Sequence, residues 1–193
     1  ETSGNYAVSI VANPSAGSEF RYPSYKSEVI SIEKLDSVES LTLSNNVVTW
    51  NEVVKAVEYK VVIENDDNKY IFDAGVYTSF DLSDVLEDVT GGEYKLSVIA
   101  VSNNTSGINS KQSEAINITK LNAPTIFSVM HDKIVWEPVE NAVSYMLKYN
   151  DGEVISVDTN EYTLPLNSPA GTYNFKFLAV GDGSEFITSK WTE

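Results

Sequence analysis

Apolar and polar residues alternate along much of this chain, so that every second residue is apolar. Tyr59, Val61 and Ile63 alternate with Lys60, Val62 and Glu64. Residues 94–98 and 145–149 follow the same pattern. A period of two puts alternate side chains on one face of a strand, whereas a helix requires a period of about 3.6. The pattern therefore predicts strands with one buried face.

Turn residues separate these strands at short intervals. Asn150 and Gly152 mark a tight hairpin, because both residue types tolerate positive φ. Residues 64–69 connect the corresponding strands of an earlier segment at greater length. Residues 83–88 are the one helix-like stretch, where Ser83 is placed to cap a single turn. Short strands, frequent turns and no long helical pattern predict an all-β sandwich.

Two blocks of sequence recur in a constant order. The pattern W-x-x-V-x-x-A-x-x-Y occupies residues 50–59 and again residues 136–145. A Gly-x-Tyr block that runs through apolar residues to Ala occupies residues 4–12, 92–100 and 171–179. Each Gly-x-Tyr block is followed by a polar loop and then by Ser-Glu or Thr-Glu. The repetition indicates tandem modules of one kind.

The order of these blocks resembles that of fibronectin type III modules. The pattern W-x-x-V-x-x-A-x-x-Y is common in tandem modules of bacterial surface and secreted proteins. The resemblance implies a tyrosine corner, in which a phenol oxygen bonds the backbone across the preceding loop, beside Leu82 or Leu164. Tyr94, Tyr173 and Tyr6 would be those corners.

Trp50 and Trp136 are expected to be equivalent core residues, each packed near its own tyrosine, Tyr59 or Tyr145. The predicted fold class is all-β, with tandem immunoglobulin-like (fibronectin type III) β-sandwiches.

The repeats divide the chain into three parts. Residues 1–33 match only the last two strands of a truncated module, residues 34–120 a complete module, and residues 121–193 a module with a shortened last strand. The linkers around Leu35 and Leu121 are short and lack Gly, which favours a semi-rigid rod. We expect the missing strands of the first module to be supplied by a preceding segment, a second chain or the adjacent module.

Composition excludes several classes of function. The formal charge is −15, with 13 basic against 28 acidic residues, which argues against nucleic acid as a partner. No stretch reaches the roughly 20 apolar residues of a membrane-spanning helix, so no membrane insertion is expected. The absence of Cys excludes disulfides and thiol chemistry, and the single His excludes a site with several histidines in one chain.

Candidate chemistry is sparse, and we predict no catalytic, cofactor-binding or metal-binding residues. His131 aligns with Asn45 in the turn before each Trp strand, which favours a turn residue over a catalytic base. Calcium prefers six to eight oxygen ligands, and two acidic groups could supply several, yet neither spells a calcium-loop pattern. The two groups are residues 64–68 and the set Asp81, Asp84, Glu87 and Asp88.

A loop at residues 13–25 carries the candidate ligand-binding residues Phe20, Tyr22 and Tyr25. Aromatic side chains in a loop can stack on sugars or anchor a protein partner. The alternative is that they cover the neighbouring module or the missing half of their own.

These observations predict a non-catalytic structural and adhesive array in an extracellular or cell-surface protein, acting as spacer and as a protein- or glycan-binding segment. The alternative is an accessory segment of a secreted polysaccharide-degrading enzyme whose active site lies elsewhere. Among 13 basic residues only Arg21 is Arg, a bias that hints at a bacterial source.

The chain is expected to fold without a metal ion. Melting temperatures measured with EDTA and with millimolar calcium should therefore agree within a few degrees. A large upward shift with calcium would instead identify the loop acids as ligands, because a ligand that binds only the folded state stabilises it by mass action.

Overall fold

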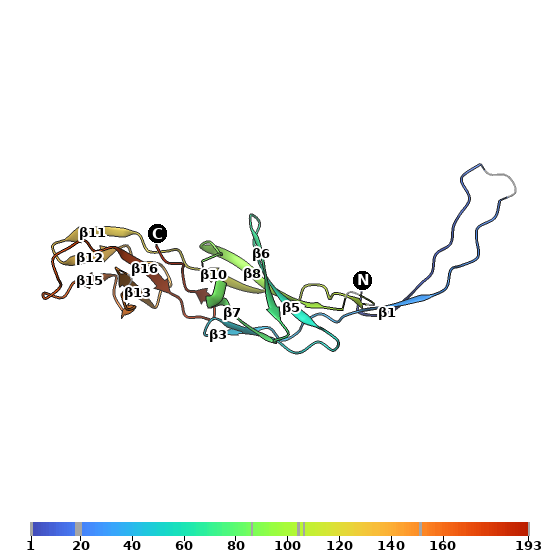
Figure 1. Cartoon of the computed structure of the whole chain (residues 1–193), viewed down its shortest axis with the longest axis horizontal. Coiled ribbons are helices and arrows are strands. Elements are labelled where there is room, and N and C mark those ends of the chain that lie inside the picture. The colour runs from blue at the N-terminus through green and yellow to red at the C-terminus, as the bar shows by residue number, and fades with distance from the viewer. Residues whose placement is uncertain are drawn as a thin grey trace.

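The computed structural model describes residues 2–17, 21–85, 87–103, 105, 107–150 and 152–192, without the side chains of Asp84 and Phe127. Regular structure in these residues is β-strand throughout, apart from one 3-10 turn, η1 (Leu82–Val85). The elements follow one another along an extended rod (Figure 1). A hairpin forms one end of the rod, and the strands β11 to β16 form the other.

The central sandwich packs a three-stranded sheet on a five-stranded one, whose edge strand β17 (Phe186–Ile187) comes from the following segment. Apart from the parallel pairing of β10 with β17, every pairing within these two sheets is antiparallel. The first sheet has the order β3 (Thr42–Ser44), β4 (Val47–Thr49), β7 (Ser79–Asp81). The second has the order β17, β10 (Ile116–Lys120), β8 (Gly92–Val101), β5 (Glu58–Glu64), β6 (Lys69–Gly75). This arrangement confirms the predicted all-β, immunoglobulin-like fold.

The C-terminal sandwich repeats the arrangement with one strand fewer in the residues described. One sheet has the order β11 (Ile126–Met130), β12 (Lys133–Trp136), β15 (Glu161–Thr163). The other has the order β14 (Ile155–Val157), β13 (Ser144–Tyr149), β16 (Phe175–Val180). A counterpart of β10 is therefore absent from the described part of this sandwich.

The N-terminal hairpin pairs β1 (Gly4–Val8) with β2 (Ile30–Lys34), and β2 also pairs with β9 (Gly107–Ile108). Its apolar side chains lie in the open, with Ile10 70% and Ile30 65% exposed. The central sandwich therefore does not cover this face, and the hairpin stands away from it (Figure 1).

The recurrent Trp-to-Tyr pattern builds the same local structure twice. In the central sandwich the Trp50 and Tyr59 rings meet edge to face at 5.5 Å, and the Val53 N–H donates to the Tyr59 hydroxyl at 2.8 Å. The Ala56 N–H then donates to the Val53 carbonyl, which closes the turn between them. Lys55, at the apex, has a φ of 69°. The pattern thus encodes a tight turn held by the tyrosine phenol.

The second copy has the same contacts. Trp136 and Tyr145 meet at 5.3 Å, and the Val139 N–H donates to the Tyr145 hydroxyl at 2.9 Å. Asn141 takes the left-handed position of Lys55, with a φ of 63°. Trp136 is fully buried and Trp50 is 6% exposed, which confirms both as core residues.

Buried apolar side chains form two clusters, one inside each sandwich. The clusters share no buried residue, but one side chain crosses the boundary. Ile187, which follows β16 in the chain, lies in the central core, while Leu121, at the start of the C-terminal part, lies in the C-terminal core. The two cores are therefore separate but interlocked.

The three expected tyrosine corners differ in their bonding partner. The Tyr173 hydroxyl donates to the Pro169 carbonyl at 2.5 Å, and Tyr6 bonds the Thr2 carbonyl in the same way. Tyr94 instead pairs with the Thr90 side-chain hydroxyl at 2.9 Å. The expectation of a backbone acceptor is therefore wrong for Tyr94, whose hydroxyl pairs with a side chain.

Two local expectations need correction. Val62, which the alternation places opposite Val61, is fully buried, because the outer face of β5 is locally covered. On the neighbouring strand β8, Ser97 lies opposite Val62 and its hydroxyl accepts a hydrogen bond from Gln112. The cap of η1 is Asp81, whose carboxylate accepts the backbone N–H of Ser83, so Ser83 is not the capping residue.

We expect Trp136→Ala to unfold the C-terminal sandwich while the central one stays folded. Truncating a buried Trp costs about 3–5 kcal/mol, a large share of the roughly 5–15 kcal/mol that hold a domain together. Amide hydrogen exchange, resolved by peptide, should report the loss in each sandwich separately. Trp191→Ala, which truncates a partly exposed Trp, is the matched control. Simultaneous unfolding of both sandwiches in the Trp136 variant would contradict separate cores.

Candidate functional site

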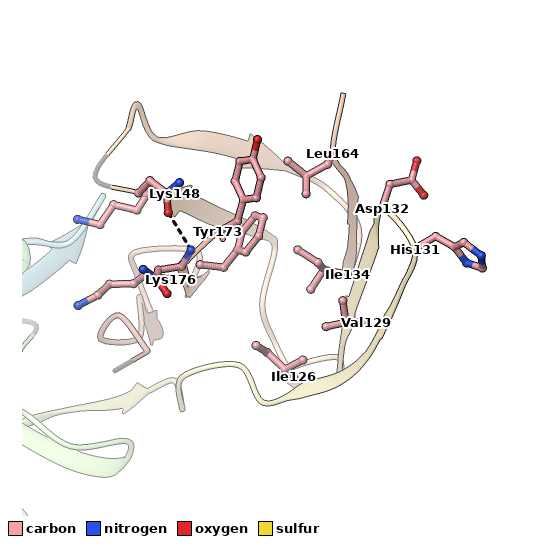
Figure 2. Close-up of a pocket in the computed structure, with 12 residues that line it drawn as sticks. Ile126, Val129, His131, Asp132, Ile134, Lys148, Leu164, Tyr173 and Lys176 are labelled. Atoms are coloured by element: carbon pink, nitrogen blue, oxygen red, sulfur yellow. Dashed lines mark hydrogen bonds between the residues drawn. The ribbon is translucent and has the colours of Figure 1, made fainter. Parts of the chain in front are cut away.

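The single histidine lies in a turn. His131 is exposed and has a φ of 55°, and its counterpart Asn45 has a φ of 51°. The turn between β11 and β12 places His131 at the rim of a neighbouring cavity, with its imidazole directed outward (Figure 2). His131 is therefore a turn residue, as predicted.

The loop acids that could have bound calcium serve local structure. Glu64 forms an ion pair with Lys69 and accepts a bond from Gln112, and these contacts lower its pKa. Asp81 is occupied in capping η1. Within the described residues, no group of three or more His, Cys, Asp or Glu side chains is arranged to hold a metal ion.

The aromatic residues of the N-terminal loop point into solvent. Tyr22 is 88% exposed and Tyr25 is fully exposed, while Phe20 lies outside the described residues. Neither tyrosine covers the central sandwich, so the expectation that they cover the neighbouring module is wrong for these two side chains. They remain candidates for binding, at the end of the rod farthest from the C-terminal sandwich (Figure 1).

Two junctions join the three parts of the chain, the first between the hairpin and the central sandwich and the second between the two sandwiches. The second junction is built from backbone pairing. The end of β10 runs parallel to β17 (Phe186–Ile187), a short strand in the loop after β16. The Leu121 N–H donates to the Ile187 carbonyl at 2.9 Å, so the linker itself is part of a ladder. A flexible linker would leave these groups to water; here they are fixed.

Further contacts cross the second junction. The Asn46 N–H donates to the Gly183 carbonyl at 2.8 Å, and the Trp191 N–H donates to the Glu87 carboxylate at 3.2 Å. Gly183 has a φ of 74°, and a β-carbon there would lie 2.8 Å from the Asn46 nitrogen. Glycine is required at this position both by its conformation and by the close approach.

Asp182 holds the loop that makes this approach. Its carboxylate accepts the backbone N–H groups of Ser184, Glu185 and Phe186. These hydrogen bonds favour the charged form and lower the pKa of Asp182 to about 2. The loop therefore keeps its shape until the pH falls far below neutrality.

Lys120 is the buried charge of the second junction. It is only 3% exposed, and its ammonium group donates to the Thr188 carbonyl of the next sandwich. Burial lowers the pKa of Lys120 to about 7, while the Glu87 carboxylate opposes that shift and Lys190 adds to it. Lys120 therefore joins the two sandwiches at the cost of desolvating its charge.

The boundary between the hairpin and the central sandwich, the first junction, has the same design. The end of β2 runs parallel to β9, and the Leu35 N–H donates to the Ile108 carbonyl at 3.0 Å. Glu33 adds an ion pair with Lys55 at 2.6 Å. Leu35 and Leu121 thus mark equivalent points of a repeated connection.

A further repeated feature, which the sequence patterns above do not include, is the hydroxyl pair S-x-x-[ST] after each Gly-x-Tyr strand. Each hydroxyl accepts an N–H from the preceding strand, and the backbone N–H of the same Ser or Thr donates to the carbonyl of the same strand residue. The pairs are Ser27 with Ile10, Ser24 with Ala12, Ser113 with Val98, Ser110 with Ala100, Thr192 with Phe177, and Ser189 with Ala179. The spacing of these serines was visible in the sequence and could have identified where the last strand begins to pair.

Comparison with known proteins finds likeness among solved structures. No protein family matches the sequence, and no curated protein does. A two-domain fibronectin type III segment of chicken tenascin matches with a TM-score of 0.31 and 19% identity, over 80% of this chain and 95% of that chain. The FN1–FN3 domains of chicken CNTN1 match with a TM-score of 0.29 and 15% identity, over 89% of this chain and 68% of that chain. The fold itself rests on the strand order given above.

We expect Lys120→Met to raise the melting temperature, most strongly below about pH 7. Between the folded pKa of about 7 and the ordinary value of 10.5, the unfolded chain holds a proton that the folded chain lacks. The stability of the native protein therefore rises with pH across this window, and the advantage of the variant shrinks. Thermal melts from pH 6 to pH 10 measure the difference.

Lys95→Met is the matched control, because Lys95 is exposed on the adjacent strand β8. Its effect should not change over the same pH range. If the rise in melting temperature caused by Lys120→Met stays constant with pH, the lowered pKa of Lys120 is contradicted.

Proposed function

We propose that this chain is a non-catalytic, semi-rigid spacer segment of an extracellular multidomain protein. The observation that supports it best is the second junction, where the linker forms a strand ladder and the C-terminal sandwich places Ile187 in the core of the central one. A junction that holds two sandwiches at a fixed angle keeps the distance between the ends of the rod fixed, whereas a flexible linker lets the sandwiches rotate freely.

Composition fits this role. A net charge of −15 keeps such a rod soluble and repels nucleic acid and anionic surfaces. Within the described residues, no helix is long and apolar enough to cross a membrane. An accessory segment of a secreted polysaccharide-degrading enzyme would make the same use of this rod.

We further propose an adhesive role for the tip of the N-terminal hairpin. Tyr22 and Tyr25 present large aromatic surfaces to solvent at the end of the rod. Rings held in this way can stack on a sugar or fill a pocket of a protein partner. Loss of glycan or protein binding in Tyr22→Ala and Tyr25→Ala, with an unchanged melting temperature, would identify this surface.

Gly183→Ala should loosen the second junction without unfolding either sandwich. The β-carbon meets the Asn46 backbone at 2.8 Å, and alanine is strained at a φ of 74°. Because the chain has no Cys, spin labels can be placed at Asp66→Cys in the central sandwich and Asp158→Cys in the C-terminal one. Pulsed electron resonance should give a narrow distance distribution for the native protein and a broad one for the variant.

Gly171→Ala is the control, because a β-carbon there meets nothing within 4 Å. It should leave the distribution narrow. A broad distribution in the protein with native Gly183 would contradict the semi-rigid spacer.

A further inference from the structure

The strand β6 forms an open edge of the central sandwich. It is the last strand of the five-stranded sheet, and in the described part of the chain it pairs only with β5. Successive residues of a strand turn their N–H and C=O groups to opposite sides. Every second residue of β6 therefore presents these groups to a side on which the described residues place no strand. This edge lies within the module that both junctions flank.

β6 is unusually long for such a position. A long open edge can pair with another chain, and natural edge strands are therefore often short or interrupted. β14, which holds the same place in the C-terminal sandwich, has three residues, whereas β6 has seven and no Pro. Figure 1 shows the β5–β6 hairpin projecting sideways from the rod. The edge of β6 is therefore both long enough and accessible enough to accept a further strand.

Apolar side chains are exposed along β6 and directly after it. Ile71, in the middle of the strand, is 53% exposed, whereas Val62 opposite it on β5 is fully buried. Val76 and Tyr77, which follow the strand, are 71% and 70% exposed. Removing such surface from water favours association. This edge therefore offers apolar contact area as well as backbone hydrogen bonds.

Two opposite charges flank Ile71 at equal distances along the strand. Lys69 precedes it by two residues and Asp73 follows it by two, so all three lie on one face of β6. Lys69 forms an ion pair with Glu64 of β5, and Asp73 forms one with Lys60. Their side chains are nevertheless 48% and 73% exposed. A strand with this charge order is complementary to a reversed copy of itself.

We propose that β6 pairs antiparallel with β6 of a second copy of this chain, so that the two five-stranded sheets continue as one. Ile71 lies on the two-fold axis, opposite Ile71 of the second copy. Lys69 of each copy then lies opposite Asp73 of the other. On the inner face of the sheet, Tyr70 of each copy lies opposite Phe72 of the other. Because both copies use the same surface, the contact closes at the dimer.

This register continues the cross-strand pairs that each copy already has. Within one copy, Lys60 of β5 lies opposite Asp73, and Glu64 lies opposite Lys69 in the same way. Across the joined sheet, charges of alternating sign follow one another in the order Lys60, Asp73, Lys69, Glu64. A shift of two residues in one direction would place Asp73 opposite Asp67, and like charges in opposed positions destabilise a strand pair. The charge order therefore selects the register centred on Ile71.

The inner face gains a second set of contacts. The rings of Tyr70 and Phe72 are stacked within one copy, with centroids 6.4 Å apart, and both pack against the edge of the core while remaining partly exposed. In the dimer each ring lies beside a ring of the second copy, and aromatic cross-strand pairs stabilise a sheet. The net charge of −15 on each copy opposes association, so these local contacts must outweigh it.

The first test is the mass of the full chain against concentration, by sedimentation velocity. We expect monomers and dimers, with the dimer fraction rising with concentration and no larger species. The contact involves one strand pair and is small, so the dimer should dissociate on dilution. A chain that stays monomeric at the highest attainable concentration overturns the proposal, and so does assembly that continues beyond the dimer.

The second test places a charge on the two-fold axis. Ile71→Lys brings two ammonium groups together and should raise the apparent dissociation constant at least about tenfold. Ile71 is exposed, so the variant should remain folded. Val154→Lys is the matched control, because Val154 is 54% exposed in the C-terminal sandwich, and it should dimerise like the native chain. Native dimerisation of the Ile71 variant places the contact elsewhere and overturns the proposal.

The third test reads the register through a charge exchange. Lys69→Asp and Asp73→Lys each bring like charges together in their own dimers, so each variant alone should dimerise at least about tenfold more weakly. An equal mixture should recover dimerisation, because every opposed pair in the mixed dimer has unlike charges. Lys133→Asp, which breaks an exposed ion pair with Glu161 in the C-terminal sandwich, is the control and should dimerise like the native chain. A mixture that stays monomeric overturns the proposal.

Discussion

The parallel pairing between the end of one module's last strand and a short strand in the next module determines how this molecule is held together. A chain that simply passed from one sandwich to the next would leave the linker's N–H and C=O groups to water and its dihedral angles free. Here Leu35 and Leu121 donate into the following loop strands, β9 and β17. The linker residues thereby belong to both neighbours, and rotation about them would break ladder bonds.

Several other features depend on that pairing. Gly183 can approach Asn46 only because the loop that carries β17 is held against the central sandwich. Asp182 organises the same loop through three backbone N–H groups. Lys120, at the end of β10, is covered by the next sandwich and bonds its Thr188 carbonyl. The ammonium group of Lys120, which would be exposed in an isolated module, is buried at the second junction. Burial opposes its protonation and so lowers its pKa.

The two sandwiches show how one missing neighbour changes a strand. β8 has partners on both sides and runs for ten residues, while β16 runs for six, although the Gly-x-Tyr blocks that begin them match. The ladder bonds of the first four positions depend on a strand like β10. In the residues described, residues 171–174 have no such partner and lie outside strand geometry.

Much of the fold could be predicted from the sequence, because its determinants are local or repeated. The alternation of apolar residues predicts strands, and the W-x-x-V-x-x-A-x-x-Y pattern encodes a turn whose bonds join residues at most six positions apart. Burial of Trp50 and Trp136 follows from that turn. Tertiary structure alone decided the rest, because it depends on what lies across a boundary. Val62 is buried beside Ser97 of the neighbouring strand, and the buried Lys120 bonds Thr188, which is distant in the chain. Alternation along one strand carries no record of such neighbours.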